Sequence, residues 1–274
     1  MPMRINHSYN AAGTKRYLEV SDYLEADTNR FSKGRWFGKG AQLFGLEGDV
    51  DKAVFDRLVD NQHPFEDELL TQRQHANRRC GTDLTFTTPK SVSILWAETQ
   101  DDAILQAVQR AAHDTLAELE KVAQTRVNHE RGSMSLQKTG NLLGASFLHT
   151  TSRPVDGYPD PALHIHCYAV NATHTDGRWT AVDLSAVYRD SGLYEAIFQS
   201  KLAEQLKGLG YPVEPTSRDF EIAGFSRKTI DKFSRRTALI EAEAEARGIT
   251  NALEKGQLGA KTRWRAPQKV IQRL

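Results

Sequence analysis

The middle of the chain alternates hydrophobic and polar residues in five short runs. Such alternation puts successive side chains on opposite faces of a strand, so each run predicts a half-buried β-strand. The runs are 82–87, 125–129, 141–150, 163–172 and 178–182. Turn signals at Asp156-Gly157 and at Asp176-Gly177 separate the last three runs. These turns predict that neighbouring runs pair as antiparallel strands.

Four other segments have the hydrophobic period of an amphipathic helix. The predicted helices cover roughly 11–26, 50–59, 101–122 and 188–206. Acidic residues such as Asp101 and Asp102 are typical of a helix start, and glycines such as Gly208 and Gly210 are typical of a helix end. The sequence therefore predicts an α+β fold in which helices flank a central antiparallel sheet.

The net charge of the chain is small, but the charges are unevenly distributed along it. A formal net charge of +1 over 274 residues does not by itself indicate a polyanionic partner. After Pro215, however, lysines and arginines outnumber acidic residues. This change predicts a core of residues 1–215 and a basic, mainly helical part of residues 216–274. A basic run of this kind fits a solvated helical face and a nucleic-acid surface equally well.

The cysteines and the termini bear on where the protein works. Cys80 and Cys167 stand far apart without a CxxC pair, which argues against a cysteine zinc site and a disulfide framework. The sequence has no signal-peptide pattern and no run of ~20 apolar residues. We therefore expect a soluble cytoplasmic protein.

Three histidines in the strand-like runs predict a metal site. His164 and His166 flank Ile165, so both imidazoles are expected on one face of the strand. His149 ends the preceding run, and pairing of the two strands would bring its ring to the same face. Asp83 is placed to hold the second nitrogen of one ligand. A lone His-x-His pair more often only makes hydrogen bonds; the third histidine and the aspartate favour a catalytic metal with open coordination positions.

Six segments of the chain resemble relaxases of the MobF class. This class belongs to the endonuclease superfamily named for its His-hydrophobe-His motif. The segments occur in the family's order and span nearly the whole chain: Trp36–Ala41, Gly81–Ser93, Thr139–Leu142, His149–Arg153, His164–His166 and Phe233–Thr237. The resemblance implies site- and strand-specific nicking and rejoining of DNA at a plasmid transfer origin, for conjugation, in the bacterial cytoplasm.

The resemblance also implies which residues carry the chemistry. A tyrosine near the N-terminus attacks the phosphodiester in this family and forms a 5′-phosphotyrosyl adduct, and Tyr17 looks equivalent. Tyr23 looks like the tyrosine of a later strand-transfer step. Relatives often have tyrosine doublets at both places, whereas Leu18 and Leu24 follow here. Asp83 would orient a histidine and accept the phenolic proton. Without the resemblance, both tyrosines would be assigned to the core face of an amphipathic helix.

The remaining implications concern cofactor and partner. His149, His164 and His166 would hold a divalent ion, Mg²⁺ or Mn²⁺. No nucleotide is expected, because the glycine-rich segment 34–40 has no Ser or Thr after Lys39. The partner would be single-stranded DNA beside a duplex or hairpin, together with other transfer (relaxosome) proteins, and the protein would be a monomer. Relatives commonly continue into a helicase, so a longer natural chain is expected.

Basic and aromatic residues are candidates for holding the DNA. Charge-assisted hydrogen bonds to phosphates are expected from Lys90, Arg153, Arg235 and Arg236. Stacking on bases is expected from aromatic side chains near basic residues, with burial in the core as the equal alternative. The aromatic candidates are Trp36, Trp179, Phe233 and Trp264.

Two other functions share parts of this pattern. A rolling-circle replication initiator uses the same chemistry for a different purpose. A metal-stabilised DNA-binding module without nicking activity would need the histidines but not Tyr17. The match across all six segments favours the relaxase.

Overall fold

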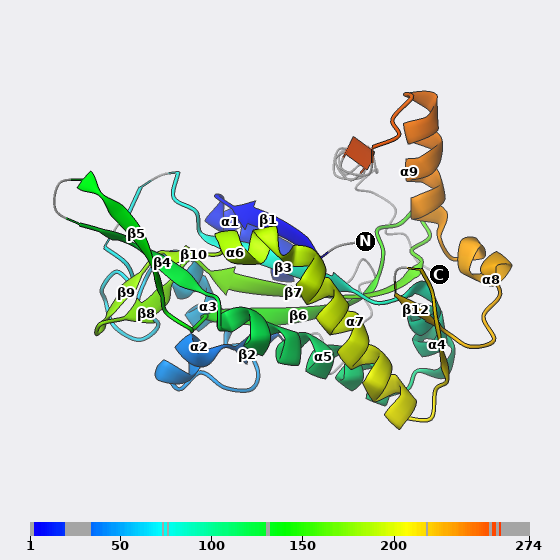
Figure 1. Ribbon diagram of the computed structural model, residues 1–274, viewed down its shortest axis with the longest axis horizontal. Helices are drawn as coiled ribbons and strands as arrows, with labels where there is room; N and C mark the ends of the chain where they lie inside the picture. The colour runs from blue at the N-terminus through cyan, green and yellow to red at the C-terminus, as the bar shows by residue number, and fades with distance from the viewer. Residues whose placement is uncertain are drawn as a thin grey trace.

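A five-stranded antiparallel sheet lies at the centre of the molecule (Figure 1). Its strand order is β1-β3-β7-β6-β2. The strands are β1 (Arg4–Ser8), β2 (Arg35–Phe37), β3 (Gly81–Thr87), β6 (Gly144–Thr151) and β7 (Pro161–Val170). This computed structural model describes residues 3–19, 34–72, 74–75, 77–129, 132–217, 219–251, 254–255 and 258. It confirms the predicted α+β fold and the antiparallel pairing of the two histidine-bearing strands.

One face of the sheet packs against three helices, α4 (Lys90–Thr99), α5 (Asp102–Glu120) and α7 (Ser191–Gly208). Side chains of β3 and β7 such as Leu84, Phe86 and Ile165 are fully buried in this core. The rings of Phe86 and Phe198 stack with centroids 4.9 Å apart. The Asp101 side chain accepts a hydrogen bond from Ala103 N, which caps α5 as the sequence predicts.

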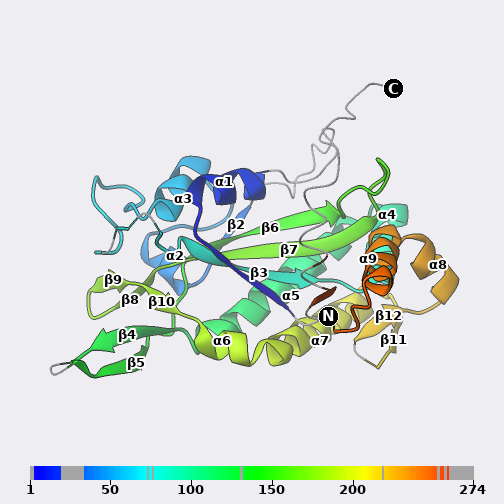
Figure 2. The ribbon, with the colours of Figure 1, turned by 90° about the horizontal axis from the view of Figure 1, so that it is seen from above.

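The opposite face packs against α1 (Ala11–Glu19), α2 (Lys39–Leu43) and α3 (Lys52–Val59). Figure 2 shows α1 and α3 on one side of the sheet and α5 and α7 on the other. Ala11 packs against this second core, and Lys15 forms a 2.6 Å ion pair with Asp60 just after α3. Helix α1 is thereby tied to one defined face of the sheet.

The glycine-rich segment 34–40 allows a close approach of two backbones. Gly38 has φ +91°, and a Cβ there would lie 2.2 Å from the Leu142 carbonyl oxygen. Gly40 N donates a 2.8 Å hydrogen bond to that same oxygen. Only glycine combines this conformation with this approach, so packing accounts for the segment. Trp36 within it is 7% exposed and belongs to the second core.

A two-stranded arm projects from one end of the molecule (Figure 1). It consists of β4 (Gln124–Asn128) and β5 (Met134–Lys138), and β10 (Val182–Asp183) pairs with β4 at its base. The predicted strand 178–182 is in fact two short strands. Strand β9 (Arg178–Thr180) pairs with β8 (Thr173–Thr175), and β10 turns to the arm.

The C-terminal region begins with a hairpin and continues as helices. Strands β11 (Val213–Pro215) and β12 (Phe220–Ile222) pair with each other, and the boundary predicted after residue 215 falls in the turn between them. Helices α8 (Arg227–Lys232) and α9 (Arg235–Ala246) follow, and α6 (Ser185–Arg189) precedes α7. Glu221 accepts hydrogen bonds from the backbone and hydroxyl of Ser91, which joins β12 to the start of α4. No helix among the described residues is long and apolar enough to cross a membrane.

Candidate metal centre

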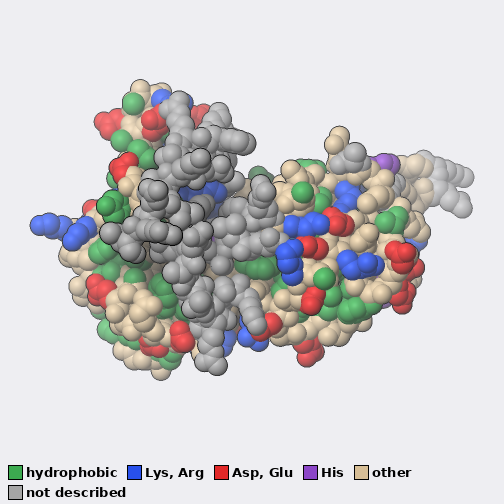
Figure 3. Space-filling model, turned by 180° about the vertical axis from the view of Figure 1, so that it is seen from behind, with side chains coloured by type: hydrophobic (Ala, Val, Ile, Leu, Met, Phe, Trp, Pro, Cys, Tyr) green, Lys and Arg blue, Asp and Glu red, His purple; other side chains and the backbone are tan. Residues whose placement is uncertain are grey.

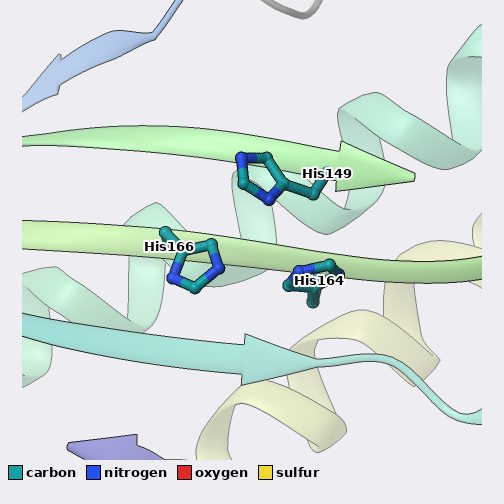
Figure 4. Close-up of side chains that lie close together, drawn as sticks. All are labelled: His149, His164 and His166. Atoms are coloured by element: carbon teal, nitrogen blue, oxygen red, sulfur yellow. The ribbon is translucent and has the colours of Figure 1, made fainter. Parts of the chain in front are cut away.

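Strands β6 and β7 bring the three predicted histidines together on one face of the sheet (Figure 4). His149 lies directly opposite His164 in the strand register. The ring centroids are 4.9 to 5.2 Å apart, and one ligand nitrogen from each ring lies within 4.8 Å of the others. A β-bulge follows this pair, because β7 has one residue more than β6 before Thr151 pairs with Pro161. Bulges re-aim side chains beside functional sites.

Hydrogen bonds fix which nitrogen of two rings carries a proton. His164 Nδ1 lies 2.8 Å from the Ala162 carbonyl oxygen, and His166 Nδ1 lies 2.8 Å from Asp83 Oδ2. Both partners are acceptors, so both Nδ1 atoms donate. In a neutral imidazole the lone pair then resides on Nε2. These two nitrogens are therefore prepared to bind a cation.

The protonation of His164 also suits a metal ligand. Burial lowers its pKa well below the usual value of 6.5, and the neighbouring His166 and His149 rings lower the pKa further. The cause is that a charged imidazolium loses hydration and meets like charges. His164 therefore stays neutral near pH 7, the form that coordinates metals.

Asp83 stands behind the cluster on the neighbouring strand β3. Thr85 of that strand pairs with His166, and Asp83 pairs with Tyr168 two residues along, so all four side chains share one face. The Asp83 side chain is 13% exposed. Its second oxygen, Oδ1, is buried and has no hydrogen-bond partner within the described ranges. A carboxylate behind a histidine ring is the usual way to orient a metal ligand and raise its basicity.

The donor set fits a divalent cation. Three converging imidazole nitrogens are borderline ligands that suit first-row divalent ions, and three ligands leave coordination positions open on such an ion. A second cluster, His63 with Glu66 and Glu68, fits a metal less well. His63 Nδ1 accepts the backbone N–H of Glu66 at 3.0 Å, so in the neutral ring Nε2 carries the proton and offers no lone pair.

An Asp83→Asn substitution is expected to weaken metal binding by about 10- to 100-fold, because an amide holds the His166 ring less firmly and leaves it less basic. Isothermal titration with Mn²⁺ measures this. Asp176→Asn in an exposed turn is the matched control, since asparagine tolerates the positive φ of 50° found there. Equal affinities of the Asp83→Asn and wild-type proteins would show that Asp83 does not support the ligand.

The lysine and arginines predicted to bind phosphates differ in their surroundings. Lys90 Nζ donates a 2.8 Å hydrogen bond to the Pro161 carbonyl, and burial lowers its pKa. Arg235 binds the carboxylate of Asp160. Arg153 is half-buried in the loop after β6, and Arg236 is half-buried in the first turn of α9. On the face shown in Figure 3, lysines and arginines are interspersed with acidic residues.

Arg4 is a cation near the centre that the sequence analysis missed. It is exposed on β1 opposite Thr85, which in turn lies opposite His166, so these side chains share one face of the sheet. Its charge contributes to the lowered pKa of His164. Arg4 and Lys90 also line a cavity of about 180 Å³, together with the carboxylates Glu195, Asp219 and Glu221. The alternation of residues 3–8 was the available signal for this strand.

The candidate tyrosines and aromatic residues lie in several parts of the chain. Tyr17 lies in α1, the helix on the metal-bearing face, and its side chain lies outside the described part of the chain. Tyr23 and Trp264 lie outside the described residues. Trp179 stacks on Phe44 with centroids 4.7 Å apart, and Lys232 Nζ lies 5.9 Å from the Phe233 ring centroid.

A three-histidine cluster on an antiparallel sheet, with a carboxylate behind one ring, defines a metal-dependent nuclease site of the His-hydrophobe-His type. Residues 8–273 match the TrwC relaxase family, and the chain belongs to this family. Among curated proteins it is similar to the multifunctional conjugation protein TraI of Escherichia coli (strain K12), with 35% identity over 190 residues, 66% of this chain. The chain spans about a tenth of that relative, since the match covers 10% of its length.

Solved structures of a relaxase have the same fold. The chain matches conjugative relaxase TrwC in complex with oriT DNA, a metal-bound structure, with a TM-score of 0.84 and 31% identity. This match covers 98% of the present chain and 93% of the other. A second match is TrwC complexed with a 27-mer DNA comprising the recognition hairpin and the cleavage site, with a TM-score of 0.81, 29% identity, and 98% and 93% coverage. The metal-bound relative and the histidine cluster together support a divalent metal in this site.

Proposed function

We propose that the protein nicks one DNA strand at a plasmid transfer origin and rejoins it through a covalent 5′-phosphotyrosyl intermediate, for conjugative transfer. The observation that carries this proposal is the cluster of His149, His164 and His166 backed by Asp83, in a member of the relaxase family. The DNA complexes and conjugation roles named for its relatives support it.

Tyr17 is proposed as the nucleophile. Its phenol oxygen attacks the scissile phosphorus, and a P–O bond to tyrosine forms. The bond to the 3′ oxygen breaks, and that oxygen takes up a proton from solvent and leaves as a 3′-hydroxyl. A phenol of pKa about 10 must lose its proton in this step, and Asp83 Oδ1 is proposed to accept it. Tyr23 is proposed to act in a later strand transfer.

The three histidines are proposed to hold Mg²⁺ or Mn²⁺. When bound, the ion draws electron density from the scissile phosphate and offsets the charge that develops there. His166 is kept in position by Asp83, and His164 by the Ala162 carbonyl. Because a phosphotyrosine ester keeps the energy of the broken phosphodiester, rejoining is proposed to need no nucleotide.

The DNA partner is proposed to be a single strand beside a hairpin. A two-stranded antiparallel ribbon fits the major groove of a duplex, and the β4–β5 arm has this form. A hollow of about 690 Å³ at its base is lined by Arg79, Arg126 and Arg178, among others. The basic part 216–274, with Arg235 and Arg236, is proposed to close over the strand, and Lys90 and Arg153 to contact its phosphates. We further propose that the protein acts as a monomer in the bacterial cytoplasm with other relaxosome proteins.

One experiment tests this proposal directly. Labelled single-stranded oligonucleotides that tile the transfer region of the plasmid carrying the gene are incubated with the protein and Mg²⁺ or Mn²⁺. We expect a denaturation-resistant protein–DNA adduct on one strand, and its loss on chelation. If strands are bound but no adduct forms on any of them, the protein is a binding module; if chelation leaves the adduct unchanged, the metal site is not catalytic.

A further inference from the structure

We infer that Tyr158, at the tip of the β6–β7 connection, is a stacking platform for a base of the single strand that leads to the metal centre. The inference rests on the proposed function and adds a residue that neither the sequence pattern nor the comparisons assign. It identifies the ligand by its chemistry: an unpaired nucleobase with a free π-face.

The backbone holds Tyr158 in a fixed place relative to the histidines. After His149 pairs with His164 and Thr151 with Pro161, Ser152 N donates to the Asp160 carbonyl at 2.8 Å. The hairpin then closes with two backbone hydrogen bonds: Val155 N donates to the Tyr158 carbonyl at 3.1 Å, and Tyr158 N donates to the Val155 carbonyl at 3.0 Å. Its two turn residues, Asp156 and Gly157, have φ of 52° and 84°, as a two-residue hairpin turn of the I′ type requires. Beyond the bulge, these backbone hydrogen bonds connect the metal-bearing hairpin to the tyrosine.

The guanidinium of Arg235, held by Asp160, lies over the Tyr158 ring. The guanidinium carbon of Arg235 lies 5.8 Å from the ring centroid. Asp160, which is 2% exposed, accepts hydrogen bonds from Arg235 N at 2.8 Å and from Arg235 Nε at 2.7 Å. A buried carboxylate held by both a backbone N–H and a guanidinium fixes the arginine in one geometry. Arg235 is therefore already held beside the Tyr158 ring, and DNA binding does not have to order the arginine side chain.

The ring remains available to a ligand. Tyr158 is 67% exposed, so it contributes little to the hydrophobic core. Two of the four aromatic residues that the sequence offered for stacking are occupied differently: Trp36 is buried, and Trp179 already stacks on Phe44. Tyr158 thus combines exposure, a fixed position and a place at the end of the hairpin that carries the histidines.

An aromatic ring can stack with any of the four bases, but it favours single-stranded over double-stranded DNA. An unpaired base can place its face on the ring, whereas a paired base in a duplex already stacks on its neighbours. Loss of one such ring lowers single-strand affinity by about 5- to 100-fold. The strand next to the scissile phosphate has to be single to enter the site, and the platform lies on its path.

The test compares Tyr158→Ala with Tyr158→Phe and with Tyr188→Ala. Tyr188 is a matched control, 62% exposed on α6 and away from the histidines. Fluorescence anisotropy measures affinity for labelled oligo(dT) and for a duplex of the same length, with chelator present so that no cleavage occurs. We expect Tyr158→Ala to lose about tenfold in affinity for oligo(dT) and little for duplex, and Tyr158→Phe to retain most of the affinity.

Photocrosslinking supplies a second readout. Oligo(dT) in which thymidines are replaced by 5-iododeoxyuridine is expected to crosslink to the peptide that contains Tyr158. Wild-type affinity of Tyr158→Ala for oligo(dT), or a matching loss in Tyr188→Ala, would overturn the platform. If the wild type binds oligo(dT) through Tyr158 but forms no adduct with transfer-region DNA, the nicking proposal fails and the platform stands.

Discussion

Replacing Tyr17 by phenylalanine is expected to lower the yield of the covalent protein–DNA adduct by at least about 10⁴-fold. The substitution removes a single oxygen atom and keeps the aromatic ring, so helix α1 should pack as before. Without the phenol no phosphotyrosyl ester can form. The measurement is the labelled adduct on a denaturing gel, with the affinity for the same oligonucleotide determined in chelator.

The matched control for this variant is Tyr188→Phe, which makes the same chemical change on the exposed surface of α6. Both variants should bind the oligonucleotide as the wild type does, and only Tyr17→Phe should lose the adduct. A wild-type yield of adduct from Tyr17→Phe would mean that another residue is the nucleophile, and Tyr23 would be the next candidate.

His166→Ala is expected to reduce metal affinity by more than about 100-fold, beyond the effect of changing Asp83 alone. The variant loses one of three ligands. It also leaves Asp83 Oδ2 without its strongest hydrogen bond in a largely buried place, which costs about 1–3 kcal/mol of the free energy of unfolding. Titration with Mn²⁺ and urea unfolding in chelator separate the two effects.

His129→Ala controls for the loss of an imidazole, because His129 is exposed and its ring hydrogen-bonds to the Ser135 side chain in the turn of the arm, not to the metal cluster. It should keep both metal affinity and stability. Should His166→Ala bind Mn²⁺ like the wild type, the three histidines would not be the metal ligands. A normal unfolding free energy with lost metal binding would show instead that Asp83 tolerates the missing partner.

Several elements could be predicted because their signals are local. The alternation in 82–87, 141–150 and 163–172 predicts strands that the structure has as β3, β6 and β7, and the helix predicted for 101–122 is α5, Asp102–Glu120. The predicted helix 11–26 is present as α1 over 11–19, and the rest of that range lies outside the described residues.

Other elements were missed because no local pattern marks them clearly. Strands β2 and β5 are short, and the two-residue period needs more positions to be distinguished from chance. Helix α4 begins directly after Pro89, only two residues beyond the strand-like run 82–87, so one proline marks both the end of a strand and the start of a helix. Its hydrophobic residues lie on most sides because it packs between β7 and β12.

The sequence by itself determined that His164 and His166 share a face, since alternation along a strand is a property of the backbone alone. It also marked the turn at Asp156 and Gly157. Only the tertiary structure decided that Asp83, 83 residues before His166, meets its ring, and that Arg235 is held by the buried Asp160 beside Tyr158. These contacts depend on the pairing of β3 with β7 and on the placement of α9. Burial of apolar surface over the whole fold fixes both, and no local pattern specifies which distant strand supplies the partner.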